Sequence, residues 1–159
     1  MNTRIRLSSL LVALLVAGAA SAGTSSVTFA NSEHFSDLPN DPLVREQVLV
    51  DLTEHFRSLA AKLPAGQDLK VDVTDIDLAG HSWPFWGTRE LRVLDGGADW
   101  PHMKLHYTLS QDGTVIKSGD ELVQNMAYLT GLNRYSTGDS LRYEKQMLDS
   151  WYRAQIAGR

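Results

Sequence analysis

The sequence has no cysteine among its 159 residues. Disulfide bonds, cysteine-ligated zinc sites and cysteine nucleophiles are therefore excluded. A lipid anchor on an N-terminal cysteine is excluded for the same reason. A domain of about 140 residues buries roughly two-thirds of the surface of its unfolded chain. The core is therefore large enough to hold this protein together without cross-links.

Positive charge is also scarce. The chain has 15 Lys and Arg residues against 19 Asp and Glu residues, and its net charge is −4. The basic residues form no cluster or stripe, which a protein needs in order to bind the phosphate backbone of nucleic acids. We therefore expect no nucleic-acid partner.

Long apolar runs are missing everywhere except at the start of the chain. Arg4 and Arg6 precede the run LSSLLVALLVAGAASA, which ends in small residues. A basic start, a short apolar middle and a small-residue exit are typical of a secretory signal peptide. The run is shorter than the roughly 20 apolar residues of a membrane span. We expect cleavage after Ala22 to remove residues 1–22, and residues 23–159 to form a single exported domain without a membrane span.

Two amphipathic helices are predicted by the spacing of apolar residues. The first begins after Asn40 or Asp41, which can cap it, and has Pro42 in its first turn. Its apolar stripe consists of Leu49, Leu52, Phe56, Leu59 and Leu63. The second helix begins after Asp139 or Ser140. Its stripe consists of Leu141, Leu148, Tyr152 and Ile156.

Strands are predicted before and after the first helix. The alternating segments are SVTFA, VDVTDIDL, RELRVL, MKLHYTLS and TVIKSGDELV. Between the last two, Asp112 and Gly113 match a type I′ turn, because both central residues of that turn take positive φ. Sequential strands with few helices between them favour an α+β domain. We expect an antiparallel sheet of about four to five strands with two helices packed on one face.

The strand VDVTDIDL changes its apolar face halfway along. Val71 and Val73 alternate on odd numbers, whereas Ile76 has an even number. Side chains in a strand alternate with a period of two. The switch therefore predicts a β-bulge near Thr74 and Asp75, because a bulge adds one residue to the strand.

Asp75 and Asp77 lie on one face of this strand, about 7 Å apart. Two such carboxylates can share a divalent cation or divide acid and base roles. Together with His81 they are the candidate site of a metal-dependent or hydrolytic enzyme. The structural alternative is that they are solvent-facing aspartates at a corner of the sheet.

No established metal or catalytic motif accompanies these aspartates. His102 and His106 share a strand face but are about 13 Å apart there. The chain contains no His-Glu-x-x-His or EF-hand spacing and no Gly-x-Ser-x-Gly elbow. We therefore expect no metal and no cofactor, and an enzyme is the less favoured interpretation.

The segment WPFWG has an unusual composition for a connection between strands. Trp83, Phe85 and Trp86 can form an exposed platform for a glycan, a partner protein or a membrane surface. Alternatively, these rings fold back and close one end of the core.

Two arginines flank the predicted start of the second helix. Helix N-termini attract anions, and arginine binds carboxylate or phosphate through two hydrogen bonds. Arg134 and Arg142 are therefore candidate ligand-binding residues. The alternative is that they tie the preceding loop to its own helix through Asp139 or Glu144.

Four segments of the chain resemble an uncharacterised family of exported bacterial proteins, domain of unknown function 3016. They are the signal-like segment followed by VTFAN, and the segments LKVDVTDIDLAG, MKLHYTLSQDGTVIKSGDELV and NRYSTGDSLRYEKQMLDSW. The resemblance covers nearly the whole chain after residue 22 and implies a small periplasmic protein of a Gram-negative bacterium. It implies no activity and no catalytic residue.

Together these features favour a non-catalytic periplasmic protein that binds an envelope protein, a glycan or a small molecule. The candidate binding residues are Trp83, Phe85, Trp86, Asp75, Asp77, Arg134 and Arg142. The alternative is a metal-dependent or hydrolytic periplasmic enzyme that uses Asp75, Asp77 and His81.

Overall fold

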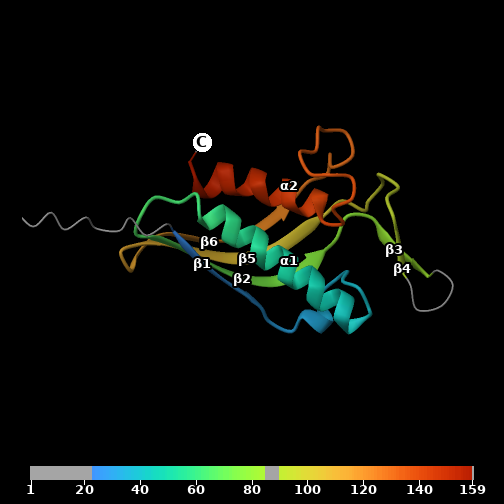
Figure 1. Cartoon of the computed structure of the whole chain (residues 1–159), viewed down its shortest axis with the longest axis horizontal. Coiled ribbons are helices and arrows are strands. Elements are labelled where there is room, and N and C mark those ends of the chain that lie inside the picture. Colours follow the sequence, from blue (N-terminus) through green and yellow to red (C-terminus); the bar gives the residue numbers. More distant parts are fainter. Residues whose placement is uncertain (1–22, 85–89, 159) are drawn as a thin grey trace, which may run out of the picture.

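The computed structural model describes residues 23–84 and 90–158, which form an α+β fold as the sequence predicted (Figure 1). The fold has a four-stranded sheet, a separate two-stranded sheet and two α-helices. The elements in chain order are β1 (Thr24–Phe29), η1 (Ser32–His34), α1 (Pro42–Ala60), β2 (Gln67–Asp77), β3 (His81–Pro84), β4 (Glu90–Val93), β5 (His102–Gln111), β6 (Thr114–Gln124), α2 (Arg142–Trp151) and η2 (Tyr152–Ile156). No helix in the described part of the chain has the length and apolar character to cross a membrane.

The main sheet is mixed, whereas the sequence predicted an antiparallel one. Its strand order is β1-β2-β5-β6. The pairs β2–β5 and β5–β6 are antiparallel, but β1 runs parallel to β2. The reason is the connection through α1, which carries the chain back to the end of the sheet at which β1 began.

The strand around Leu91 belongs to a different sheet from the one expected. β4 pairs only with β3 in the described structure, and the two form a hairpin that projects from the body of the fold (Figure 1). The chain leaves the main sheet at Gly80, which has φ of +80°. A Cβ atom at this position would lie 2.2 Å from the carbonyl oxygen of Val93, so this close approach of two backbones requires glycine.

The predicted β-bulge in β2 is confirmed. The pairing with β5 shifts by one residue between Val73 and Asp75. Val73 before the bulge and Ile76 after it are both buried in the same core. Asp75 and Asp77 consequently lie on the opposite face of the strand.

The start of α1 and the turn between β5 and β6 also follow the sequence. Asp41 is the N-cap of α1, and its carboxylate accepts hydrogen bonds from the backbone N–H groups of Leu43 and Val44. Asp112 and Gly113 have φ angles of 50° and 80°, as a type I′ turn requires.

The start of α2 differs from the prediction. Its N-cap is Leu141, which has no side-chain capping bond. Asp139 lies two residues earlier, where its carboxylate accepts a hydrogen bond of 2.9 Å from the N–H group of Leu141. The aspartate therefore stabilises the turn before the helix rather than capping the helix itself.

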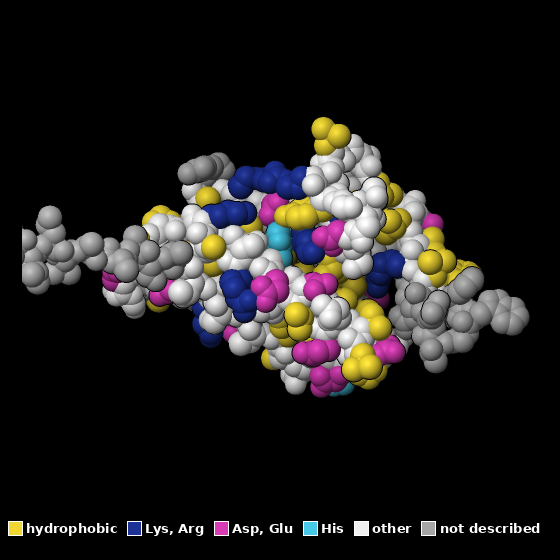
Figure 2. Space-filling view, in the orientation of Figure 1, with side chains coloured by type: hydrophobic (Ala, Val, Ile, Leu, Met, Phe, Trp, Pro, Cys, Tyr) yellow, Lys and Arg dark blue, Asp and Glu magenta, His cyan; other side chains and the backbone are white. Residues whose placement is uncertain are grey.

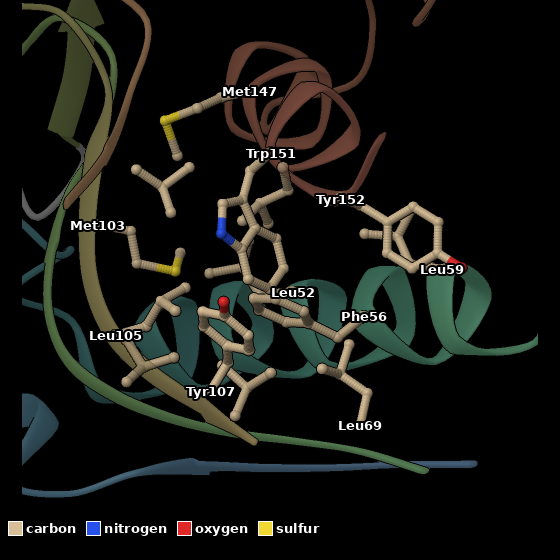
Figure 3. Close-up of a cluster of buried hydrophobic side chains, with 14 of the residues drawn as sticks. Leu52, Phe56, Leu59, Leu69, Met103, Leu105, Tyr107, Met147, Trp151 and Tyr152 are labelled. Carbon is tan, nitrogen blue, oxygen red and sulfur yellow. The ribbon is translucent and has the colours of Figure 1, made fainter. Parts of the chain in front are cut away.

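Trp151 of α2 lies at the centre of the core (Figure 3). Its ring contacts Phe56 of α1 edge-to-face at 6.3 Å between centroids, and Tyr107 of β5 at 5.7 Å. One tryptophan thus joins both helices to the central strand of the sheet. The largest fully buried side chains of the described structure are Phe56, Leu52, Leu59, Leu69, Ile76, Met103, Leu141, Leu148, Val71, Val73 and Pro101.

The burial of Trp151 leads to a stability prediction. Truncation of a buried tryptophan to alanine costs about 3–5 kcal/mol, which in a domain of this size lowers the melting temperature by roughly 10 °C or more. We therefore expect that drop for Trp151→Ala in thermal unfolding followed by circular dichroism. The matched control is Trp83→Ala, because 58% of Trp83 is exposed. A similar drop in both variants would contradict the assignment of Trp151 as the central core residue.

Candidate functional site

The described structure contains a pocket of about 600 Å³. It lies between the start of α1, the start of α2 and the base of the β3–β4 hairpin. In Figure 2, apolar side chains gather around a hollow beside this hairpin, with Lys and Arg side chains at its edge. The lining residues are Pro39, Asp41, Val44, Val48, Leu78, Ala79, Ser82, Arg92, Leu94, Thr137, Asp139, Ser140, Leu141, Arg142 and Tyr143. We call this cavity the hairpin pocket.

The apolar walls of the hairpin pocket come from four separate segments. Val44 and Val48 are one helical turn apart on α1, so both side chains point to the same side of that helix. Leu78 follows the end of β2, Leu94 follows β4 and Leu141 precedes α2. The pocket therefore exists only when both helices are docked and the chain has turned away from the main sheet.

Arg92 of β4 holds the corner where β2 ends. Its Nη1 atom donates a hydrogen bond of 2.7 Å to the carboxylate of Asp37. The same atom lies 3.2–3.4 Å from the carbonyl oxygens of residues 78, 79 and 80. These carbonyls have left the sheet ladder, and backbone polar groups in a partly buried position need other partners. The Nη1 atom of Arg92 is a shared hydrogen-bond donor for these three carbonyl oxygens.

Glu144 lies under the same corner. It is almost fully buried, and its Oε1 atom accepts a hydrogen bond of 2.7 Å from the N–H group of Ala79. Its Oε2 atom has no hydrogen-bond partner among the described residues. Burial raises the pKa of this carboxyl above its ordinary value, although the Ala79 N–H and the charge of Arg92 act in the opposite direction.

Two carboxylates of the pocket are already engaged. Asp41 accepts from the first N–H groups of α1. Asp139 accepts from the N–H group of Leu141 and forms an ion pair of 2.7 Å with Lys145. Burial alone would raise the pKa of Asp139, but the hydrogen bonds from Lys145 and Leu141 outweigh it and keep the pKa below its usual value.

Arg142 is the exception among the charged residues of the pocket. Its guanidinium carbon lies 4.4 Å from the centroid of the Tyr143 ring, and its Nη2 atom donates to the Tyr143 hydroxyl. Among residues 23–83 and 91–158, whose side chains the structure describes, no carboxylate lies within ion-pair distance of Arg142. The stacking orients the guanidinium, and its positive charge is not neutralised by the pocket.

The structure places Asp75 and Asp77 outside the hairpin pocket. Asp75 accepts hydrogen bonds of 2.8 and 2.9 Å from Ser36 and forms an ion pair of 2.9 Å with Lys104. Burial would raise the pKa of Asp75, but these hydrogen bonds outweigh it and lower the pKa. Asp77 lies 3.7 Å from Nε2 of His102, and its pKa is raised by burial.

The two aspartates are thus part of a polar sheet face that fixes the segment after β1. No cluster of three or more potential metal ligands is found in the described part of the chain. His81, the third residue of the enzyme alternative, has a different partner and lies 3.6 Å from Asp95. That alternative stays a prediction.

The aromatic segment is only partly described. Trp83 in β3 is exposed, and its ring meets the ring of His81 edge-to-face at 6.2 Å. It pairs across the hairpin with Leu91, which is also exposed. Phe85 and Trp86 lie outside the described residues, so their part in a contact surface stays a prediction.

Arg134 is exposed, lies beside a buried polar cluster and does not line the hairpin pocket. Its Nη1 atom lies 3.5 Å from the buried carboxylate of Asp149. The same carboxylate accepts a hydrogen bond of 2.9 Å from the Tyr135 hydroxyl and lies 3.2 Å from Nε2 of His55. Burial lowers the pKa of His55, although the charge of Asp149 opposes this effect, and the cluster joins α1, α2 and the loop before α2. Arg134 therefore ties the loop to α2, through Asp149 rather than through Asp139 or Glu144, and its part in ligand binding stays a prediction.

The sequence did not reveal the roles of two residues beside the pocket: Arg92 was not identified, and Glu144 was considered only as a partner of Arg134 or Arg142. Arg92 could not be found, because alternation along β4 shows which residues share a face but not what that face meets. Glu144 had a detectable signal. It lies between Leu141 and Leu148 at helical spacing, so it occupies the apolar stripe of α2, and a charged residue there indicates burial with a specific partner.

A comparison with protein-family models identifies the family to which this chain belongs. Residues 23–154 match the family described as protein of unknown function (DUF3016). The chain belongs to this family. Searches of curated proteins and of solved structures find no match for this DUF3016 protein. The match begins at residue 23 and includes every residue that lines the hairpin pocket.

The burial of Glu144 predicts an unusual pH dependence of stability. Because its folded pKa is raised above the ordinary value of 4.5, the native carboxyl adds stability below that pH, and this stability is lost as pH rises through the folded pKa. Glu144→Gln keeps an acceptor for the Ala79 N–H but cannot ionise. In melts measured from pH 4.5 to pH 8, we expect the melting temperature of Glu144→Gln, relative to wild type, to increase as the pH rises above 4.5 and to level off once the native carboxyl is ionised.

The control for this experiment is Glu46→Gln, which removes an exposed carboxylate from α1. The difference in melting temperature between Glu46→Gln and the wild type should stay constant over the same pH range. If the Glu144→Gln difference is independent of pH, the carboxyl does not change its protonation on folding in the way described.

Proposed function

We propose that this DUF3016 protein is a non-catalytic binding protein of the cell envelope, and that its hairpin pocket binds a small amphipathic anion. The ligand has an apolar body and a carboxylate, sulfonate or phosphate group. The observation that carries the proposal is the charge of Arg142, which no carboxylate neutralises, at the wall of a pocket whose surface is mostly apolar.

The size and lining of the pocket support a small ligand. Binding sites for small molecules are typically 300–1,000 Å³ in volume, mostly apolar, with few polar groups that orient the ligand. The hairpin pocket has a volume of about 600 Å³, and its apolar walls include Val44, Val48 and Leu94. Val44 is 51% exposed although it is apolar, as expected for a wall that a ligand would cover.

The charges support an anion. Asp41 already accepts hydrogen bonds from N–H groups of α1, and Asp139 is paired with Lys145. Arg142 is held by its stacking on Tyr143. A pre-oriented guanidinium loses little freedom when it binds a carboxylate, and such charge-assisted bonds are about twice as strong as neutral ones.

The proposed ligand class can be tested with anilinonaphthalene sulfonate, a fluorescent apolar anion. We expect saturable binding with one site per chain to the native protein. Arg142→Gln removes the charge, and because a hydrogen bond to a charged group contributes about 1.5–3 kcal/mol, we expect affinity at least roughly tenfold weaker. A second readout is the melting temperature, which a ligand of the native state raises.

Arg153→Gln is the matched control. Arg153 lies in η2 beyond the pocket and donates a hydrogen bond to Ser150. Equal loss of binding in the Arg142 and Arg153 variants would show that the probe recognises surface charge in general. Unchanged binding by Arg142→Gln would remove the argument for an anion, and no saturable binding by the wild type would overturn the proposal.

The envelope location rests on the sequence of residues 1–22 and on the resemblance to exported proteins. If these residues are a signal peptide, expression of the full chain in a Gram-negative host yields a periplasmic protein that begins at Gly23, as seen by N-terminal sequencing and intact mass. Ala22→Leu should block the processing, since the peptidase requires small residues before the cut. A wild-type protein that keeps residues 1–22 and stays in the cytosolic fraction would rule out export.

A further inference from the structure

One edge of the main sheet is long and carries exposed apolar side chains. β6 is the last strand in the order β1-β2-β5-β6, and it has 11 residues. Three of its apolar side chains are more than half exposed: Val115 at 58%, Ile116 at 53% and Leu122 at 51%. An edge strand presents unpaired backbone N–H and C=O groups, and an apolar edge readily pairs with another chain.

We propose that β6 binds β6 of a second copy of this chain, antiparallel, about a twofold axis at Gly119. The two four-stranded sheets would then form one continuous sheet. Residues whose numbers add to twice 119 lie opposite one another in this register. Lys117 then faces Glu121 of the second copy, and Ile116 faces Leu122 of the second copy.

The two faces of β6 make these contacts consistent. Lys117, Gly119 and Glu121 lie opposite Leu109, Tyr107 and Leu105 of β5, so they are on the core-facing side of the sheet. By alternation, Ile116, Ser118 and Leu122 are on the other side. Each charge pair and each apolar pair therefore joins residues on the same face, and the twofold axis repeats both pairs. Cross-strand pairs of this kind are the units that stabilise a sheet.

The neighbouring registers are not self-complementary. A twofold axis at Ser118 places Ile116 opposite Asp120. An axis at Asp120 places two Asp120 carboxylates opposite each other, which is destabilising. The axis at Gly119 has no side chain on the core-facing side, where an added Cβ would lie 3.3 Å from the ring of Tyr107.

The bulge in β6 limits the pairing to the central part of the strand, and the lysine on this edge needs a partner. The register with β5 shifts between Leu109 and Ser110, which leaves Ile116 as an extra residue, so the strand bends at this end of the proposed contact. A lysine on an edge strand ordinarily discourages pairing, but this register supplies it with a carboxylate. Lys117 also donates to the backbone carbonyl of Gln155, which holds its side chain at the edge. We expect a weak dimer, since a contact of about seven residues per chain is a small interface.

The first test is charge reversal, measured by sedimentation velocity up to a protein concentration on the order of 1 mM, the range suited to small interfaces. Lys117→Glu places Glu opposite Glu, and Glu121→Lys places Lys opposite Lys, each twice. We expect each single variant to weaken the dimer at least roughly tenfold, and the double variant to restore it. Failure of the double variant to restore the dimer would overturn the register.

The second test uses the absence of cysteine from the chain. Ser118 lies opposite Asp120 of the second copy, so a mixture of Ser118→Cys and differently tagged Asp120→Cys should form a disulfide heterodimer under mild oxidation. Each variant alone places its two cysteines about 8 Å apart, too far for a disulfide. Equal cross-linking by one variant alone, or none by the mixture, would contradict the proposal.

Binding of anilinonaphthalene sulfonate in the hairpin pocket is the control for correct folding of the β6 variants. None of the residues that line the hairpin pocket belongs to β6. A correctly folded monomeric variant therefore binds anilinonaphthalene sulfonate as the wild type does, so a failure of the dimer is distinguished from a failure of the binding proposal. A wild type that stays monomeric at every concentration would overturn the proposal outright.

Discussion

The packing of Trp151 between Phe56 and Tyr107 is the contact on which the rest of the structure depends. It joins α1, α2 and the central strand β5 in one place. Apolar contacts of this kind are the main favourable term in folding, and aromatic pairs add to it through edge-to-face geometry. The hairpin pocket is built from the starts of the same two helices, so its shape depends on how this tryptophan sets the distance between them.

A second constraint arises where β2 leaves the sheet. From residue 78 to residue 80 the backbone loses its ladder partners, and two side chains replace them. Arg92 donates to the carbonyl oxygens, and Glu144 accepts from the N–H group of Ala79. Much of the polar chemistry beside the pocket therefore serves the fold, because buried backbone groups without partners are costly. Arg142 differs from these residues because its charge has no carboxylate partner among residues 23–83 and 91–158, and this is why we propose it as a binding group.

The same distinction explains the aspartates of β2. A pair of carboxylates on one strand face is compatible with metal binding or with acid–base catalysis, and the sequence correctly indicated that they share a face. Ser36, Lys104 and His102 come from distant parts of the chain and surround the two carboxylates. Hydrogen bonds to a charged carboxylate favour its ionised form, so Asp75 anchors the segment after β1 as a stable anion.

Local patterns in the sequence determined the helix stripes, the bulge in β2, the Asp112-Gly113 turn and the cap at Asp41. Each depends on residues that are close together in the chain, and helical or strand periodicity expresses them directly. Only the tertiary structure decided that β1 is parallel to β2, that β4 pairs with β3, and that Arg92 and Glu144 meet at one corner. Periodicity shows which side chains share a face, but the strand, carbonyl or ring that the face meets comes from a segment far away. That choice depends on the packing of the whole domain, which no short window of sequence contains.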